Sequence, residues 1–114
     1  MIFGANRIPI VHWLKQQAGE TMDHAWKIGE KMTALGLHPE MRVTPVPETG
    51  KHSVLEVLAE SLEYERQGLD GYKALLALVL RAYPGDSALE DWVRGFIAAE
   101  TEHIQDTEKM LRTM

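Results

Sequence analysis

Apolar residues recur every three or four positions along three stretches of the chain, and proline and glycine separate these stretches from one another. Such alternating spacings are typical of one face of an α-helix, whereas a half-buried strand shows a period of two. The pattern predicts helices over about residues 9–35, 53–83 and 87–113. No stretch keeps a period of two, so we expect an all-α fold in a single domain over residues 1–114.

Residues that favour helix ends flank the predicted helices. Gly36 follows the first helix and suits a C-terminal cap, while Pro84 and Gly85 follow the second. Ser87 and Glu90 have the spacing of a capping box, in which a hydroxyl and a carboxylate satisfy free backbone N–H groups. This spacing places the N-terminal cap of the third helix at Ser87.

The two connections differ in length, and the difference bears on topology. A few residues around 84–86 join the second and third helices, which predicts antiparallel neighbours. Residues 37–52 join the first and second, and at ~3.3 Å per residue such a segment reaches about 50 Å. A helix of ~27 residues is about 40 Å long. A long crossover can therefore place the first two helices parallel, and the alternative is a loose surface loop.

Composition narrows the class of protein. The 114 residues are 45% hydrophobic, which is enough for one core, and the net charge of −5 argues against a nucleic-acid partner. The absence of cysteine excludes disulfides and thiolate metal sites. No apolar run approaches the ~18–20 residues of a membrane helix, and the first residues lack a signal-peptide layout. We therefore expect a cytoplasmic protein that does not enter a membrane.

Four polar residues interrupt or border the apolar faces. Glu65 lies on the apolar face of the second predicted helix, Glu100 and His103 lie on that of the third, and His24 borders that of the first. A carboxylate buried without a partner costs several kcal/mol, so each acidic residue there needs an explanation. Glu100 and His103 are three residues apart and project from one side of one helix.

Two explanations account for these buried polar residues. Carboxylates and imidazoles from facing helices are the ligands of di-iron and di-manganese proteins, and zinc accepts the same donors. The alternative is a buried Glu–His or Glu–Arg pair, or a face that is less buried than the pattern suggests. A glutamate on one helix together with a Glu-x-x-His on another favours the metal site.

The stretch from about Trp13 to Leu111 resembles bacterioferritin, a family of the ferritin-like di-iron superfamily, from that family's second helix onward. The segments that carry the resemblance are ETMDHAWKIGEKMTALGLHPEMR, SLEYERQGLDGY and AAETEHIQDTEKML. The resemblance implies a ferritin-like bundle of three long helices with one long crossover, which lacks the first helix of the four-helix bundle.

The resemblance also implies metal ligands. The bridging glutamate of the family falls on Glu65, the Glu-x-x-His pair of its last long helix on Glu100 and His103, and an earlier histidine on His24. Thr21 stands where the family has another glutamate, and a sixth ligand belongs to the absent helix. The chain thus matches four of six ligands, and iron is the metal that the resemblance implies.

Met22 matches the methionine with which the family binds haem at a two-fold axis between subunits. The resemblance therefore implies haem as a second cofactor, because a soft thioether suits haem iron. The alternative is a methionine that fills an irregular gap in the core.

Two functions follow from these features. The first is a metal-binding protein of iron oxidation and storage, with ferroxidase-type activity at a site completed between subunits. The second is a non-catalytic helical oligomerisation or scaffold relative without a working metal centre, which Thr21 and the absent helix favour. Both lead us to expect a homo-oligomer, at least a dimer, because three long amphipathic helices leave apolar surface exposed.

Overall fold

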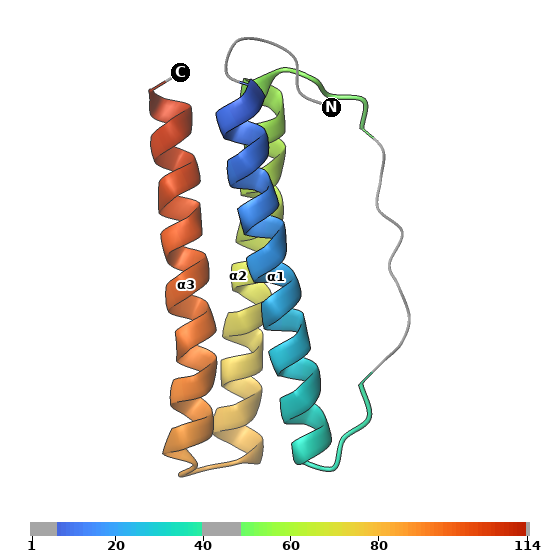
Figure 1. Ribbon diagram of the computed structural model, residues 1–114. Helices are drawn as coiled ribbons and strands as arrows, with labels where there is room; N and C mark the ends of the chain where they lie inside the picture. Colours follow the sequence, from blue (N-terminus) through green and yellow to red (C-terminus); the bar gives the residue numbers. More distant parts are fainter. Residues whose placement is uncertain (1–6, 40–48, 114) are drawn as a thin grey trace. The chain divides into compact units, whose positions relative to one another are not determined.

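The described residues form three α-helices: α1 (Arg7–Ala34), α2 (Val54–Ala82) and α3 (Ser87–Arg112) (Figure 1). The computed structural model describes residues 7–39 and 49–113, and these ranges contain no strand. The all-α fold predicted from the apolar spacing is confirmed. Each helix begins and ends within two residues of its expected bounds.

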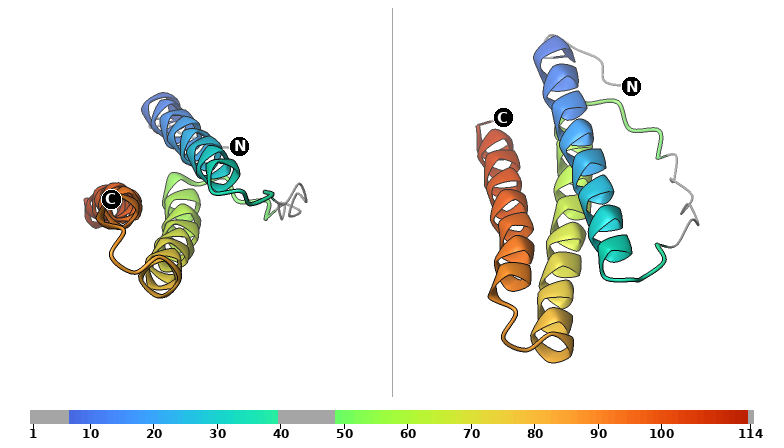
Figure 2. Two further views of the ribbon diagram at one scale, coloured as in Figure 1. Left: turned by 90° about the horizontal axis from the view of Figure 1, so that it is seen from below. Right: turned by 60° about the horizontal axis from the view of Figure 1, so that its bottom comes forward.

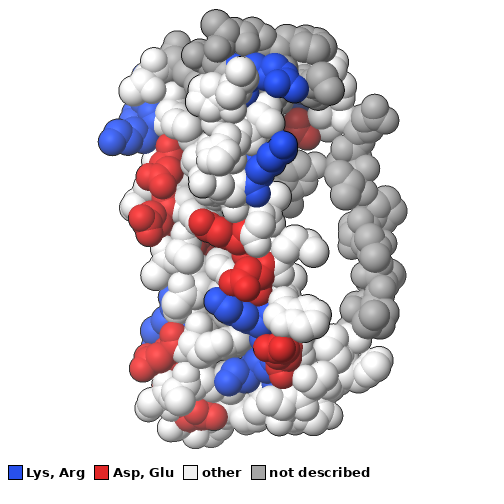
Figure 3. Space-filling view, viewed as in Figure 1, with Lys and Arg blue, Asp and Glu red and all other residues white. Residues whose placement is uncertain are grey.

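The chain divides into two compact units, residues 1–54 with α1 and residues 55–114 with α2 and α3. The predicted crossover, residues 37–52, belongs to the first unit, and its residues 40–48 lie outside the described ranges. Within those ranges, no helix is both long enough and apolar enough to cross a membrane. On the face shown in Figure 3, basic and acidic side chains both occur.

In the second unit α2 and α3 form an antiparallel helical hairpin, as the short connection predicts (Figures 1 and 2). Gly85 in the turn has a φ of 82°, a left-handed conformation that glycine adopts readily and other residues rarely adopt. The Asp86 N–H donates to the Tyr83 carbonyl at 3.2 Å and closes the turn. A glycine at this position therefore permits the chain to reverse within a few residues.

A hydrophobic cluster near the turn holds the hairpin together. Val79 of α2 packs with Leu89 and Val93 of α3, and all three are buried. Burial of one large aliphatic side chain stabilises a fold by about 1.5–3 kcal/mol, so these residues anchor one end of the hairpin. Partly buried side chains surround the cluster: Leu75, Leu76, Tyr83, Trp92 and Ile97.

The N-terminal cap of α3 is Asp86, so the predicted cap at Ser87 is wrong by one residue. The Asp86 side chain accepts a hydrogen bond from the Leu89 N–H at 3.0 Å. A carboxylate at this position satisfies one of the free N–H groups of the first turn and also interacts favourably with the helix dipole. Serine and aspartate are both good caps, and the backbone of the preceding turn selects Asp86.

The end of α1 agrees with the predicted glycine cap. Gly36 has a φ of 80°. Its N–H donates to the Thr33 carbonyl at 3.0 Å, and the Leu37 N–H donates to the Met32 carbonyl at 2.8 Å. This pair of bonds is the Schellman motif, which satisfies carbonyls left free at a helix end.

Replacement of the α3 cap tests this assignment. Asp86→Ala should lower the free energy of unfolding by about 1 kcal/mol, because the Leu89 N–H loses its acceptor. Asp86→Asn retains an acceptor and should cost much less. Asp70→Ala, at an exposed position of α2, should change stability little. Urea denaturation measures all three, and equal losses in the alanine and asparagine variants at position 86 would contradict the assignment.

Candidate functional site

Glu65 of α2 faces α3, and a hydrogen bond joins its side chain to that helix. The Thr107 hydroxyl of α3 donates to Glu65 Oε2 at 2.9 Å. Thr107 is fully buried, at 0% exposure, and its position follows the apolar face of α3. The apolar spacing that predicted both helices therefore also aims Glu65 into the interface between them.

Glu100 and His103 of α3 lie beside this interface, one or two turns before Thr107. Glu100 is buried, with 8% of its surface exposed. Its Oε2 lies 3.8 Å from His103 Nδ1, and both side chains are largely shielded from solvent. The separation of three residues along one helix places the two groups on the same side, as the sequence predicts.

The electrostatic environment of Glu65 shows that these groups share one region of the hairpin. Burial raises the pKa of the Glu65 carboxyl above its ordinary value, and the negative charge of Glu100 raises it further. Hydrogen bonds from Thr107 and Ser61 and the imidazole of His103 lower this pKa in part. Two carboxylates that lie close enough to repel each other favour either a proton or a cation between them.

An aromatic row closes the site on the side toward the turn. It consists of Tyr72, Phe96 and Trp92, in this order. The Tyr72 ring stacks on Phe96 with centroids 5.5 Å apart, and Phe96 meets the Trp92 ring edge to face at 4.7 Å. Burial raises the pKa of the Tyr72 hydroxyl, and the charge of nearby Glu100 raises it further. Tyr72 therefore borders the carboxylate site.

Gly68 of α2 lies opposite the Glu100 carboxylate. A Cβ built on Gly68 would lie 3.9 Å from Glu100 Oε1, which is ordinary van der Waals contact, and a longer side chain would approach the carboxylate more closely. Beyond the site, Arg66 and Glu108 form an ion pair of 3.7 Å at the partly exposed edge of the same hairpin. An exposed pair of this kind contributes little stability, about 0–1 kcal/mol.

The donor chemistry of the site fits a divalent metal ion, but the hairpin supplies an incomplete set of ligands. Two carboxylates and an imidazole suit iron, manganese and zinc. Over residues 7–39 and 49–113, no three His, Asp or Glu side chains converge closely enough to enclose an ion. Glu65, Glu100 and His103 thus occupy one region without forming a closed site.

The remaining candidate residues lie on α1, in the first unit. His24 is half-buried there, and its contribution to a site with Glu65 of the second unit stays a prediction. The Thr21 hydroxyl donates to the Gln17 carbonyl at 3.0 Å, an ordinary bond within a helix. Met22 has 72% of its surface exposed, so it is not the core-filling methionine considered from the sequence.

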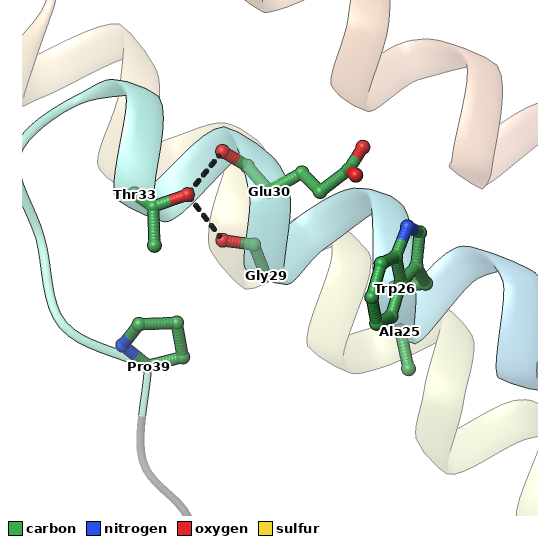
Figure 4. Close-up of a pocket in the computed structure, with 6 residues that line it drawn as sticks. All are labelled: Ala25, Trp26, Gly29, Glu30, Thr33 and Pro39. Carbon is green, nitrogen blue, oxygen red and sulfur yellow. Dashed lines mark hydrogen bonds between the residues drawn. The ribbon is translucent and has the colours of Figure 1, made fainter.

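A pocket of about 290 Å³ lies at the C-terminal half of α1. Figure 4 shows Pro39, beyond the helix end, close to Thr33, whose hydroxyl bonds to the carbonyls of Glu30 and Gly29. The lining carries a single carboxylate, that of Glu30, and no other titratable side chain. Its chemistry therefore differs from that of the hairpin site, and the sequence analysis assigned it no role.

Three residues of the hairpin site escaped the sequence analysis: Ser61, Gly68 and Thr107. Ser61 lies four positions before Glu65, and Thr107 lies four after His103, so helical spacing alone could have placed both next to the predicted ligands. The position of Gly68 opposite the Glu100 carboxylate depends on the register between α2 and α3 and leaves no signal in the spacing.

The raised pKa of Glu65 predicts a pH dependence in the metal-free protein. Between the unfolded and the folded pKa, Glu65 holds a proton in the folded state that it has released in the unfolded chain. Its contribution to the free energy of unfolding is therefore fully present below the unfolded pKa near 4.5 and is lost as the pH rises through the folded pKa. Glu65→Gln should remove this part of the pH dependence, since the amide does not ionise.

Denaturation in the presence of a chelator at several pH values measures the effect. Glu63→Gln, at an exposed position of the same helix, is the matched control and should retain the wild-type slope. Identical slopes for the wild type and Glu65→Gln above pH 4.5 would show that Glu65 is not held in an environment that resists ionisation.

Comparisons with known proteins show which family the chain resembles. A family model described as "Ferritin-like domain" matches residues 1–114. Two curated relatives, both called "Bacterial non-heme ferritin", come from Bacteroides fragilis strains 638R and YCH46. Each is 30% identical over 91 residues, which is 80% of this chain and 56% of the relative. The chain thus spans little more than half the length of these relatives.

A solved structure shares the fold. It is described as a crystal structure of ferritin-like, diiron-carboxylate proteins from Bacillus anthracis str. Ames. The TM-score is 0.85, at 20% sequence identity, over 97% of this chain and 77% of that chain. Likeness at this identity supports the fold alone, and the predicted ferritin-like architecture is confirmed, with three helices over residues 7–39 and 49–113. By the match over its whole length, the chain belongs to the ferritin-like domain family.

Proposed function

We propose that this chain is a metal-binding ferritin-like protein in which the α2–α3 hairpin provides Glu65, Glu100 and His103 to a dinuclear iron site. The observation that supports this proposal is the pairing of the buried Glu100 with the half-buried Glu65, whose pKa the charge of Glu100 raises. A divalent cation bound by both groups would turn this repulsion into attraction.

A structural ion pair explains part of the site but not all of it. His103 lies 3.8 Å from Glu100 and would stabilise that carboxylate when the imidazole is protonated. Glu65 instead accepts a neutral hydrogen bond from Thr107, and the guanidinium nearest in sequence, that of Arg66, pairs with Glu108. A Glu–His pair therefore accounts for Glu100 and leaves the half-buried Glu65, beside a second carboxylate, to be explained.

In the proposed reaction, iron is the substrate. Each Fe(II) held at the site gives one electron to dioxygen or peroxide, and the resulting Fe(III) passes to a mineral store or to solvent. Hard anionic oxygen ligands stabilise Fe(III) more than Fe(II), because the attraction grows with the charge of the ion. In this role Glu65 bridges two ions, while Glu100 and His103 bind one of them.

The site needs ligands beyond those of the hairpin. His24 of α1 is the candidate for the second ion, and further ligands would come from another copy of the chain. Exposed apolar side chains on α1 support self-association: Ile8, Met22 and Trp26 have 77%, 72% and 70% of their surface exposed. Burial of such side chains against a partner would release the water around them.

One observation favours the alternative function, a helical scaffold without a working metal centre. The Thr21 hydroxyl, at the position where the family has a ligand, bonds within its own helix. Haem lies outside our proposal, because the curated relatives are called non-heme ferritins. Manganese and zinc remain alternatives to iron at the same donors, and a cytoplasmic location stays a prediction.

Anaerobic titration with Fe(II), followed by calorimetry, tests the metal site. The wild type should bind Fe(II) stoichiometrically, and Glu65→Ala or Glu100→Ala should weaken binding at least about tenfold, since loss of even an outer-shell partner has such an effect. Glu63→Ala and Glu102→Ala, exposed on the same two helices, are the controls and should bind normally.

Absence of stoichiometric binding, or equal binding by Glu65→Ala, would refute the metal site. The scaffold alternative predicts in addition that Glu65→Leu raises the melting temperature. A buried carboxylate without a cation is less favourable than a packed apolar side chain, so this gain would support the scaffold.

Light scattering at micromolar concentration tests self-association. The wild type should have at least the mass of a dimer, and Trp26→Glu should shift it toward the monomer by placing a charge on the exposed apolar surface of α1. Gln16→Glu adds the same charge at an exposed polar position and should leave the mass unchanged. A monodisperse wild-type monomer would refute the proposed oligomer.

A further inference from the structure

The Thr107 hydroxyl has two acceptors at equal distance. Its oxygen lies 2.9 Å from Glu65 Oε2 on α2 and 2.9 Å from the His103 carbonyl oxygen on α3. A hydroxyl has one proton, so it donates to one of these acceptors at a time. Thr107 therefore connects a predicted ligand of α2 with the turn of α3 that carries another.

The carboxylate is the stronger acceptor of the two. A hydrogen bond to an ionised oxygen is shorter and stronger than one to a neutral carbonyl. The His103 carbonyl gains only the common back-bond that threonine makes to the fourth preceding residue. When Glu65 is ionised, the Thr107 hydroxyl therefore donates its hydrogen bond to Glu65 and not to the His103 carbonyl.

The bond from Thr107 restrains Oε2 of Glu65, and Oε1 does not take part in this bond. Glutamate has several rotatable bonds, and a carboxylate that must be ordered on binding loses conformational entropy at that moment. Thr107 is buried between the helices, so it holds Glu65 in place before any ligand arrives. Ser61 donates a second hydrogen bond to the same carboxylate from one turn earlier on α2.

Packing alone does not explain a hydroxyl at this position. Valine has nearly the shape of threonine and would fill the same space in an apolar interface. Thr101 of α3 offers an internal comparison, because its hydroxyl back-bonds to the Ile97 carbonyl at 2.7 Å and makes no bond to Glu65. The feature that distinguishes Thr107 is the bond to Glu65, across 42 positions of sequence.

We propose that Thr107 is a positioning residue, which holds the Glu65 carboxylate in the orientation that accepts a metal ion. This inference rests on the proposed metal-binding function and adds to it a specific outer-shell partner contributed by α3. Partners of this kind fix the direction of a ligand, and their loss weakens metal affinity without removal of any ligand.

Anaerobic titration of the whole chain with Co(II) tests this role, because the visible absorption of Co(II) reports its coordination. Thr107→Val should weaken Co(II) binding about tenfold and alter the absorption bands, while Thr107→Ser retains the hydroxyl and should restore both. Thr101→Val loses only a back-bond and should bind like the wild type. In a Glu65→Ala background, Thr107→Val should have no further effect on affinity, because Thr107 acts through Glu65.

The outcomes separate the two claims. Wild-type protein that binds no Co(II) overturns the proposed function and this inference together. If the wild type binds Co(II) and Thr107→Val binds it with equal affinity, the positioning role alone is overturned. The same holds if Thr107→Val lowers the affinity as much in the Glu65→Ala background as in the wild type. Circular dichroism checks folding, and Thr107→Ala takes the place of the valine variant if that variant does not fold, with the same expected loss.

Discussion

The placement of two carboxylates between packed helices, the buried Glu100 and the half-buried Glu65, is the constraint on which the α2–α3 hairpin depends. Glu65 and Glu100 both lie on apolar faces, where burial disfavours a charged group and each charge disfavours the other. The hairpin compensates with hydrogen bonds from Thr107 and Ser61 and with the imidazole of His103. These contacts moderate the penalty without removing it, since the pKa of Glu65 remains raised.

The rest of the hairpin provides the rigidity that such a site requires. Val79, Leu89 and Val93 fix the turn end of the two helices, with Trp92 packed against them, and the stacked rings of Tyr72 and Phe96 follow on the side toward the carboxylates. The Asp86 cap and the left-handed Gly85 set where α3 begins. Because the helices are anchored at the turn, a group on α3 such as Thr107 meets a group on α2 such as Glu65 at a defined distance.

Helical spacing in the sequence was sufficient to predict the three helices and the inward placement of Glu65, Glu100 and His103. It did not identify Thr107 as a partner of Glu65, because that contact depends on how far α2 and α3 are shifted along each other. Similarly, spacing could not choose between the neighbouring cap residues Asp86 and Ser87, which the backbone of the turn decides. The place of His24 depends on contacts between the two units and stays a prediction.

Native mass spectrometry of the protein after exposure to Fe(II) without oxygen tests the central claim most directly, because one spectrum reports both the metal content and the number of chains. Our account predicts an oligomer that retains iron in proportion to its chains, and loses it when Glu65 and Glu100 are both replaced by alanine. An iron-free wild-type protein, in any state of assembly, would contradict it and would favour the helical scaffold.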